Sequence, residues 1–113
     1  MTFSNGGYPW AGTSTGGADD NNCAYRIADF GSFKYVELRC VVGATSAFSA
    51  TTKLINLPST IAVDWDLNSW FPTSDSHATI QFSANSISLC PNAGGSTTAN
   101  YMYSFTFSYF TTA

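Results

Sequence analysis

The chain has few charged residues and no long apolar run, and each of these absences excludes one class of partner. Charged residues make up only 10% of the 113 residues, against roughly a quarter in an ordinary soluble domain. The four basic residues cannot form the basic stripe that nucleic-acid binding requires. No stretch approaches the ~20 apolar residues of a membrane span. We therefore expect neither a nucleic-acid partner nor insertion into a membrane.

The chain also lacks the residues that most catalytic sites use. Its single histidine, His77, is the only imidazole that could activate a nucleophile, and no nucleophile elbow or catalytic-cysteine signature is present. A pair of carboxylates for glycoside hydrolysis could come from Asp64, Asp66 and Asp75, with Glu37 on another strand. A chain of this length has little room for the deep cleft such a hydrolase needs. We expect no enzymatic activity.

Cysteine is sparse and widely spaced. Cys23, Cys40 and Cys90 form no CxxC motif and no Cys/His cluster, so zinc is not expected. The sequence leaves two thiol states open: three reduced cysteines, or one disulfide and one free thiol.

One acidic segment is weakly similar to a calcium loop. Asp64, Asp66 and Asn68 alternate, and Asp75 stands at the twelfth position. Ser69 occupies the sixth position, where the loop needs glycine, and no helical pattern flanks the segment. The interpretation that we prefer is a polar loop, and we expect no metal and no cofactor.

Aromatic residues, at 16%, are plentiful, and they alternate with small polar residues near the end of the chain. A period of two places alternate side chains on opposite faces of a strand. One face of the predicted strand carries Tyr101, Tyr103, Phe105, Phe107 and Tyr109. That face is too apolar to remain in water. It must be covered by a second sheet or by another subunit.

Other segments give similar, shorter strand signals, and none shows a sustained helical pattern. Residues 29–32 carry turn chemistry and should join two strands into a hairpin. The predicted strands are 23–29, 33–42, 51–57, 61–65, 77–83, 87–90 and 101–110, with a polar loop over 68–76. About seven short strands predict an all-β fold, an antiparallel β-sandwich or barrel.

The N-terminal segment has a different composition from the rest. Residues 1–22 are rich in Gly, Asn, Ser and Thr and predict an extended arm or neck, while residues 23–113 form the β-domain. Phe3, Tyr8 and Trp10 interrupt the arm and indicate that it packs against something. The N-terminus has no charged region followed by an apolar stretch, so we expect no signal peptide.

The segment around Trp70 has the composition of a sugar-contact loop. Trp70 offers a flat apolar face for a sugar ring, whereas alternation with Ile61 and Val63 points Trp65 into the core. Carboxylates, amides and imidazole supply donors and acceptors for hydroxyls. Arg39, on an outward strand face, would add a contact to a phosphate group. The candidate ligand-binding residues are Trp70, His77, Asp75, Asp64, Asp66 and Arg39.

The order of these signals resembles the head domains of bacteriophage tail receptor-binding proteins, especially those of lactococcal and related Gram-positive phages. The resemblance covers about residues 23–110 and depends on a series of short segments. These are Tyr25-Arg26-Ile27, Tyr35-Val-Glu-Leu-Arg39, Leu54-Ile-Asn-Leu-Pro58, Ile80-Gln-Phe, Ile87-Ser-Leu and the aromatic strand Tyr103-Ser-Phe-Thr-Phe-Ser-Tyr109.

The resemblance implies a homotrimer of β-sandwich or barrel heads at the tip of a tail, with residues 1–22 as the remnant of a neck. Such a head belongs to a virion, is assembled in the host cytoplasm and contacts the rest of the tail or baseplate. It binds a host cell-wall saccharide or a polysaccharide bearing glycerol phosphate, through a set that would correspond to Trp70, His77, Asp75 or Asp64, and Arg39. Two alternatives stay open: a structural tail-tip or decoration domain without a ligand, and a secreted lectin module.

Overall fold

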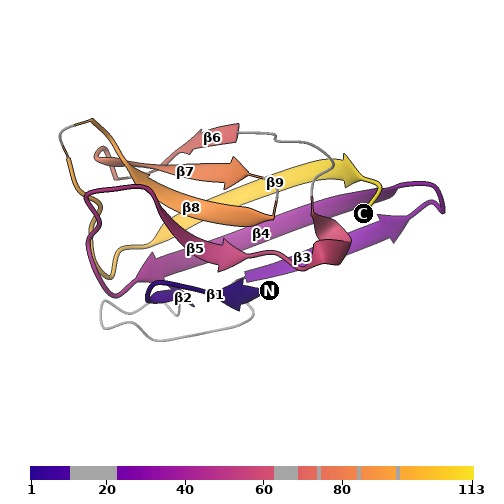
Figure 1. The fold of residues 1–113 in the computed structure, drawn as a ribbon, viewed down its shortest axis with the longest axis horizontal. Coiled ribbons are helices and arrows are strands. Elements are labelled where there is room, and N and C mark those ends of the chain that lie inside the picture. The colour runs from indigo at the N-terminus through magenta and orange to yellow at the C-terminus, as the bar shows by residue number, and fades with distance from the viewer. Residues whose placement is uncertain (11–22, 63–68, 74, 84, 94) are drawn as a thin grey trace.

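The computed structural model shows two antiparallel β-sheets packed face to face (Figure 1). It describes residues 1–10, 23–62, 69–73, 75–83, 85–93 and 95–113, with only the backbone of residues 69–72. In these ranges the only helical element is a short 3-10 helix, Ser59–Ile61. The prediction of an all-β, antiparallel fold is confirmed, with nine strands in the described ranges.

The first sheet has five strands in the order β1-β5-β8-β7-β6. They are β1 (Thr2–Phe3), β5 (Thr52–Asn56), β8 (Ser86–Pro91), β7 (Ala78–Ser83) and β6 (Ser69–Pro72). Alternation along β7 buries Ala78, Ile80 and Phe82, as its period of two predicts.

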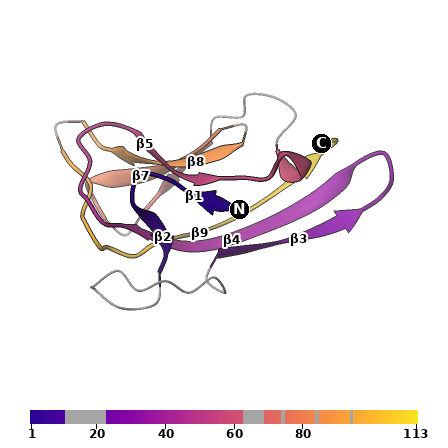
Figure 2. The same ribbon diagram turned by 60° about the horizontal axis from the view of Figure 1, so that its bottom comes forward.

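The second sheet is built around β4 (Lys34–Ala44), its longest strand. Residues 34–42 pair with β9 (Tyr103–Thr111) along one edge. The other edge pairs first with β3 (Cys23–Asp29) and then with β2 (Gly7–Pro9). The predicted hairpin of 23–29 with 33–42 is confirmed, and Gly31 in its turn has a φ of +89°. Figure 2 shows the turn of this hairpin extending beyond the end of the first sheet.

The core lies between the sheets and is largely apolar. In β4 the inward residues Val36, Leu38, Cys40 and Val42 are fully buried, as alternation predicts. In β9 the aromatic face turns the same way: Tyr103, Phe105 and Tyr109 are buried and Phe107 is half-buried. The facing sheet covers it, because the ring of Phe82 lies 4.6 Å from that of Phe107 and 5.5 Å from that of Tyr109. Of the two covers predicted for this face, a facing sheet is the one observed, and it is the first sheet.

Residues 1–10, predicted to belong to an arm, are instead part of the sandwich. Strand β1 pairs with β5 of the first sheet and β2 with β4 of the second. A turn at Asn5 and Gly6, both with positive φ, carries the chain from one sheet to the other. Tyr8 and Trp10 are buried, so the aromatic residues that indicated packing anchor this segment. Residues 11–22, the rest of the predicted arm, lie outside the described part.

Two further predictions about elements were wrong where the structure describes them. A strand was predicted over 61–65, but its first residue, Ile61, is the last residue of the 3-10 helix. The Ile61 amide donates to the Pro58 carbonyl there. Residues 63–65 lie outside the described ranges. The loop predicted over 68–76 contains β6, an edge strand, which tolerates Pro72 because its outer edge needs no ladder donor.

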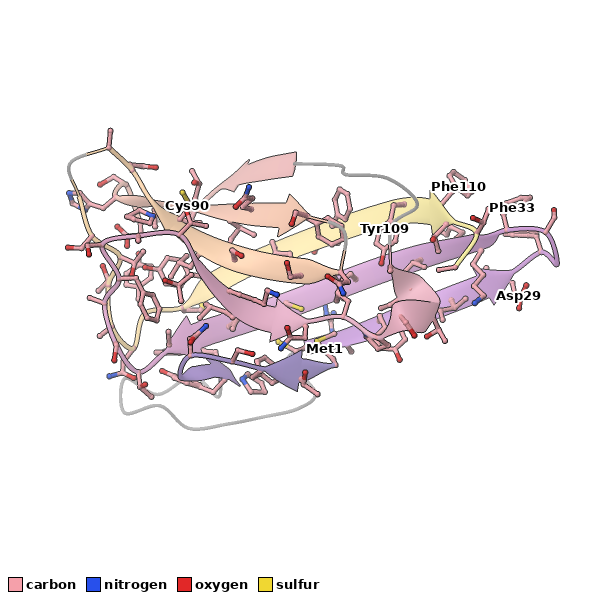
Figure 3. The ribbon with its side chains drawn as sticks, viewed as in Figure 1. Met1, Asp29, Phe33, Cys90, Tyr109 and Phe110 are labelled. Atoms are coloured by element: carbon pink, nitrogen blue, oxygen red, sulfur yellow. The ribbon has the colours of Figure 1, made fainter. Side chains whose placement is uncertain are left out.

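The packing of Phe82 predicts a large loss of stability on truncation. Phe82→Ala should lower the free energy of unfolding by about 3–5 kcal/mol, because it leaves a cavity beside Phe107 and Tyr109. Phe110, which lies at the surface beside Phe33 (Figure 3) and is 62% exposed, is the matched control. Phe110→Ala should cost less than about 1 kcal/mol. Urea unfolding followed by tryptophan fluorescence measures both, and equal losses would contradict this account of the core.

Candidate functional site

The solvent face of the second sheet holds a groove that contains both arginines of the chain. Its volume is about 380 Å³, and its lining includes Arg26, Glu37, Arg39 and Thr106. The chain has two arginines and one glutamate in all, and these three residues meet here. In a protein with so few charges, this is a marked concentration of ionic groups.

The register of the hairpin places these side chains. Arg26 in β3 lies opposite Glu37 in β4, and Nη2 of Arg26 donates to both carboxylate oxygens at 3.2 Å. The other nitrogens of Arg26 have no hydrogen-bond partner in the ranges that the structure describes. An exposed pair of this kind contributes little to folding, at most about 1 kcal/mol.

Arg39 lines the groove and is exposed. Its cross-strand neighbours are Ala24 in β3 and Thr106 in β9, which are too short to cover a guanidinium group. No described residue forms an ion pair with Arg39. The groove therefore offers a planar cationic donor to solvent, with a carboxylate acceptor and a hydroxyl nearby.

Asp75, another predicted ligand-binding residue, is buried and forms hydrogen bonds within the protein. Its Oδ2 accepts from the Tyr103 hydroxyl at 2.7 Å and from the Thr98 hydroxyl at 2.9 Å. Its Oδ1 accepts from the His77 amide at 3.0 Å. Thr73 also accepts from the Asp75 amide and donates to its carbonyl. The carboxylate thus ties the start of β7 to the loop before β9 and to β9 itself.

The pKa of the Asp75 carboxyl reflects this network. Burial alone would raise it, but the hydrogen bonds from Tyr103, the His77 amide and Thr98 outweigh burial and lower the pKa. Burial and the bond to Asp75 raise the pKa of Tyr103 to about 12. Asp75 is therefore a charged anchor of the fold, with its oxygens already engaged.

His77 lies beside Asp75 and faces solvent. Its Nδ1 is 3.4 Å from Oδ1 of Asp75, and its side chain is 68% exposed. Asp75 orients the imidazole toward the surface, where it can donate a hydrogen bond to a ligand. In the described ranges, no serine or cysteine side chain forms a hydrogen bond to the His77 ring.

The predicted ligand set is thus divided between two places. Asp75 and His77 lie together at the start of β7, and the backbone of Trp70 lies in β6, opposite Gln81 of β7. Arg39 lies on the solvent face of the other sheet. Asp64 and Asp66, and the side chain of Trp70, fall outside what the structure describes.

The sequence predicted that Glu37 and Arg39 face outward. It did not predict that Arg26 and Thr106 lie beside them. The signal for Arg26 was present, because the short turn at 29–32 fixes the register of the hairpin and so sets Arg26 opposite Glu37. Thr106 is brought in by the pairing of β4 with β9, which are distant in sequence.

Within the described ranges, no three His, Cys, Asp or Glu side chains group closely enough to hold a metal ion. No helix in those ranges is long and apolar enough to cross a membrane. Comparisons with protein-family models, with curated proteins and with solved structures give no match to this chain.

The Asp75 network predicts a specific response to acid. Because the folded-state pKa is lower than the unfolded value, the unfolded chain takes up the proton first. The stabilisation that charged Asp75 gives to the folded state is present above about pH 4. It is lost as the pH falls through the folded-state pKa. Asp75→Asn should lose about 2 kcal/mol at pH 7 and show a shallower fall in stability below pH 4.

Urea unfolding at a series of pH values between 2 and 7 measures this response. Asp29→Asn serves as the control, because Asp29 is exposed and its carboxylate caps only the turn amide of Gly31. A parallel pH profile for the wild type and Asp75→Asn would contradict the anchoring role.

Proposed function

We propose that this protein is a non-catalytic adhesin, a receptor-binding head of a bacteriophage tail that recognises a saccharide of the host cell surface. The observation that carries the proposal is the groove on the outer face of β3, β4 and β9, which gathers both arginines and the only glutamate. Such a cluster contributes little to folding, so its concentration in one groove favours a role in binding.

The groove has the properties of a rigid recognition surface. Its side chains project from paired strands and not from loops, so little conformational entropy is lost when a ligand binds. Arg39 and the Arg26 nitrogens that bond to no described residue match the oxygens of a phosphate or carboxylate group. Glu37 and Thr106 can accept and donate hydrogen bonds to sugar hydroxyls. This combination favours an anionic saccharide, such as a polysaccharide bearing glycerol phosphate.

His77 provides a second, separate contact surface in the same proposal. It is exposed and oriented by Asp75, and β6, which contains Trp70, borders β7. A polymeric ligand has many repeats and can contact both surfaces, which would increase its avidity.

Binding in the groove should depend on Arg39. Arg39→Ala should weaken binding to isolated cell-wall polysaccharide by about tenfold or more, since a charge-assisted hydrogen bond contributes about 1.5–3 kcal/mol. Arg39→Lys should recover only part of the loss, because an ammonium group cannot form the planar double contact. Biolayer interferometry on immobilised polysaccharide, with and without phosphate groups, measures these effects.

The matched control is Lys53→Ala, which removes the same charge from an exposed position in β5 of the other sheet. It should bind like the wild type. Equal losses in both variants would indicate a general charge effect. Absence of binding by the wild type to intact host cells and to isolated polysaccharide would favour a structural tail domain without a ligand.

The proposed tail head is a homotrimer. Multi-angle light scattering should therefore give a mass three times the 12.1 kDa of the chain at micromolar concentration. A monomer under those conditions would count against the phage-head assignment, while leaving the saccharide measurement to be judged on its own.

A further inference from the structure

Two of the three cysteines lie directly opposite each other in the second sheet. Cys23 of β3 is the cross-strand partner of Cys40 of β4. Partners in an antiparallel pair point to the same face, which here is the face toward the core. Cys40 is fully buried and Cys23 is half-buried. Cys90 lies in β8 of the other sheet (Figure 3). Its sulfur accepts a hydrogen bond from the Thr51 hydroxyl.

The backbone pattern of β4 shows which kind of pair this is. The Val41 carbonyl accepts from the Trp10 amide on the edge shared by β2 and β3, and the Ala44 carbonyl accepts from the Asn100 amide on the β9 edge. Successive residues alternate between edges, so the backbone groups of Cys40 point toward β9. Cys23 and Cys40 are therefore a non-hydrogen-bonded pair, with Cα atoms roughly 4.5 Å apart. A disulfide accepts Cα separations of about 4.4–6.8 Å.

The two thiols are already in contact and differ in access to solvent. A side-chain hydrogen bond with Cys23, together with burial, raises the pKa of the Cys40 thiol. Cys23 also donates to the Val41 carbonyl at 3.4 Å. The half-buried Cys23 is the thiol that a reagent in solution can reach.

We propose that Cys23 and Cys40 are a redox pair that closes into a cross-strand disulfide when the protein meets a low-molecular-weight disulfide such as oxidised glutathione. The Cys23 thiolate attacks one sulfur of the reagent, forms a mixed disulfide and releases one glutathione. The Cys40 thiolate then attacks the Cys23 sulfur and releases the second glutathione. The two thiol protons end on the two released glutathiones, so the protein loses two electrons and the reagent gains two.

The bond would secure an edge strand of the second sheet whose residues are mostly exposed. In the described ranges β3 forms its ladder with β4 alone, and its residues from Ala24 to Asp29 are exposed. Linking the two strands keeps β3 in register under oxidising conditions. This inference does not depend on the proposed function, because it concerns the strands and not a ligand.

The test uses the whole chain, incubated with oxidised glutathione and analysed by intact mass and non-reducing peptide mapping. The wild type should lose the mass of two hydrogen atoms and yield a peptide that links Cys23 to Cys40. Cys90→Ser should behave identically, and Cys23→Ser, a change at a half-buried position, should not form the link. Oxidation should raise the melting temperature of the wild type by on the order of 10 °C.

Three outcomes would overturn the proposal. One is a wild-type protein that keeps three titratable thiols. Another is a glutathione adduct on Cys23 that Cys40 does not displace. The third is a link that involves Cys90. The mapping of the wild type decides the matter without any variant, so a variant that fails to fold cannot leave the question unanswered.

Discussion

Strand β4 is paired along both edges, and every other strand of the second sheet pairs with it. Its nine-residue ladder with β9 joins the middle of the chain to its end, and its opposite edge holds β3 and β2. A strand paired on both sides has its alternation fixed, because a slip of one residue would expose Leu38 and bury Glu37. That constraint sets which side chains enter the core and which face solvent.

The same alternation produces the two features on which the proposals depend. The outward side chains of β4 include Glu37 and Arg39, and short neighbours on either side of Arg39 leave the groove open. The inward side chains include Cys40, which meets Cys23 across the β3–β4 ladder. The groove and the thiol pair thus lie on opposite faces of the second sheet. The formation of one does not require the other.

Asp75 shows how a residue with the right chemistry can have a different role. Its carboxylate suits a sugar hydroxyl, and the polar segment around it suits a binding loop. In the folded chain Tyr103 and Thr98 donate to the same carboxylate oxygen and the His77 amide donates to the other. Buried carboxylates are retained when such bonds compensate for desolvation, and this compensation stabilises the junction of β7 with β9. No local sequence pattern predicts the bond between Tyr103 and Asp75, since 28 residues separate them.

The segments that were predicted well are those whose signals are local. Alternation over 33–42 and over 101–110 decides which face of each strand is apolar, and a short turn with Gly31 decides the register of one hairpin. The first ten residues were assigned wrongly, because two- and three-residue strands give no periodic signal. Their place depends on burial of Tyr8 and Trp10 against distant strands.

The sequence by itself therefore determined the all-β class and the facing of the long strands, because each follows from spacing within short segments. Only the tertiary structure decided that Asp75 is an anchor, that Arg39 and His77 belong to separate surfaces and that the β4–β9 ladder brings Thr106 to the groove. These depend on which strands become neighbours, and that choice is made by burying the aromatic face of β9 against the opposite sheet.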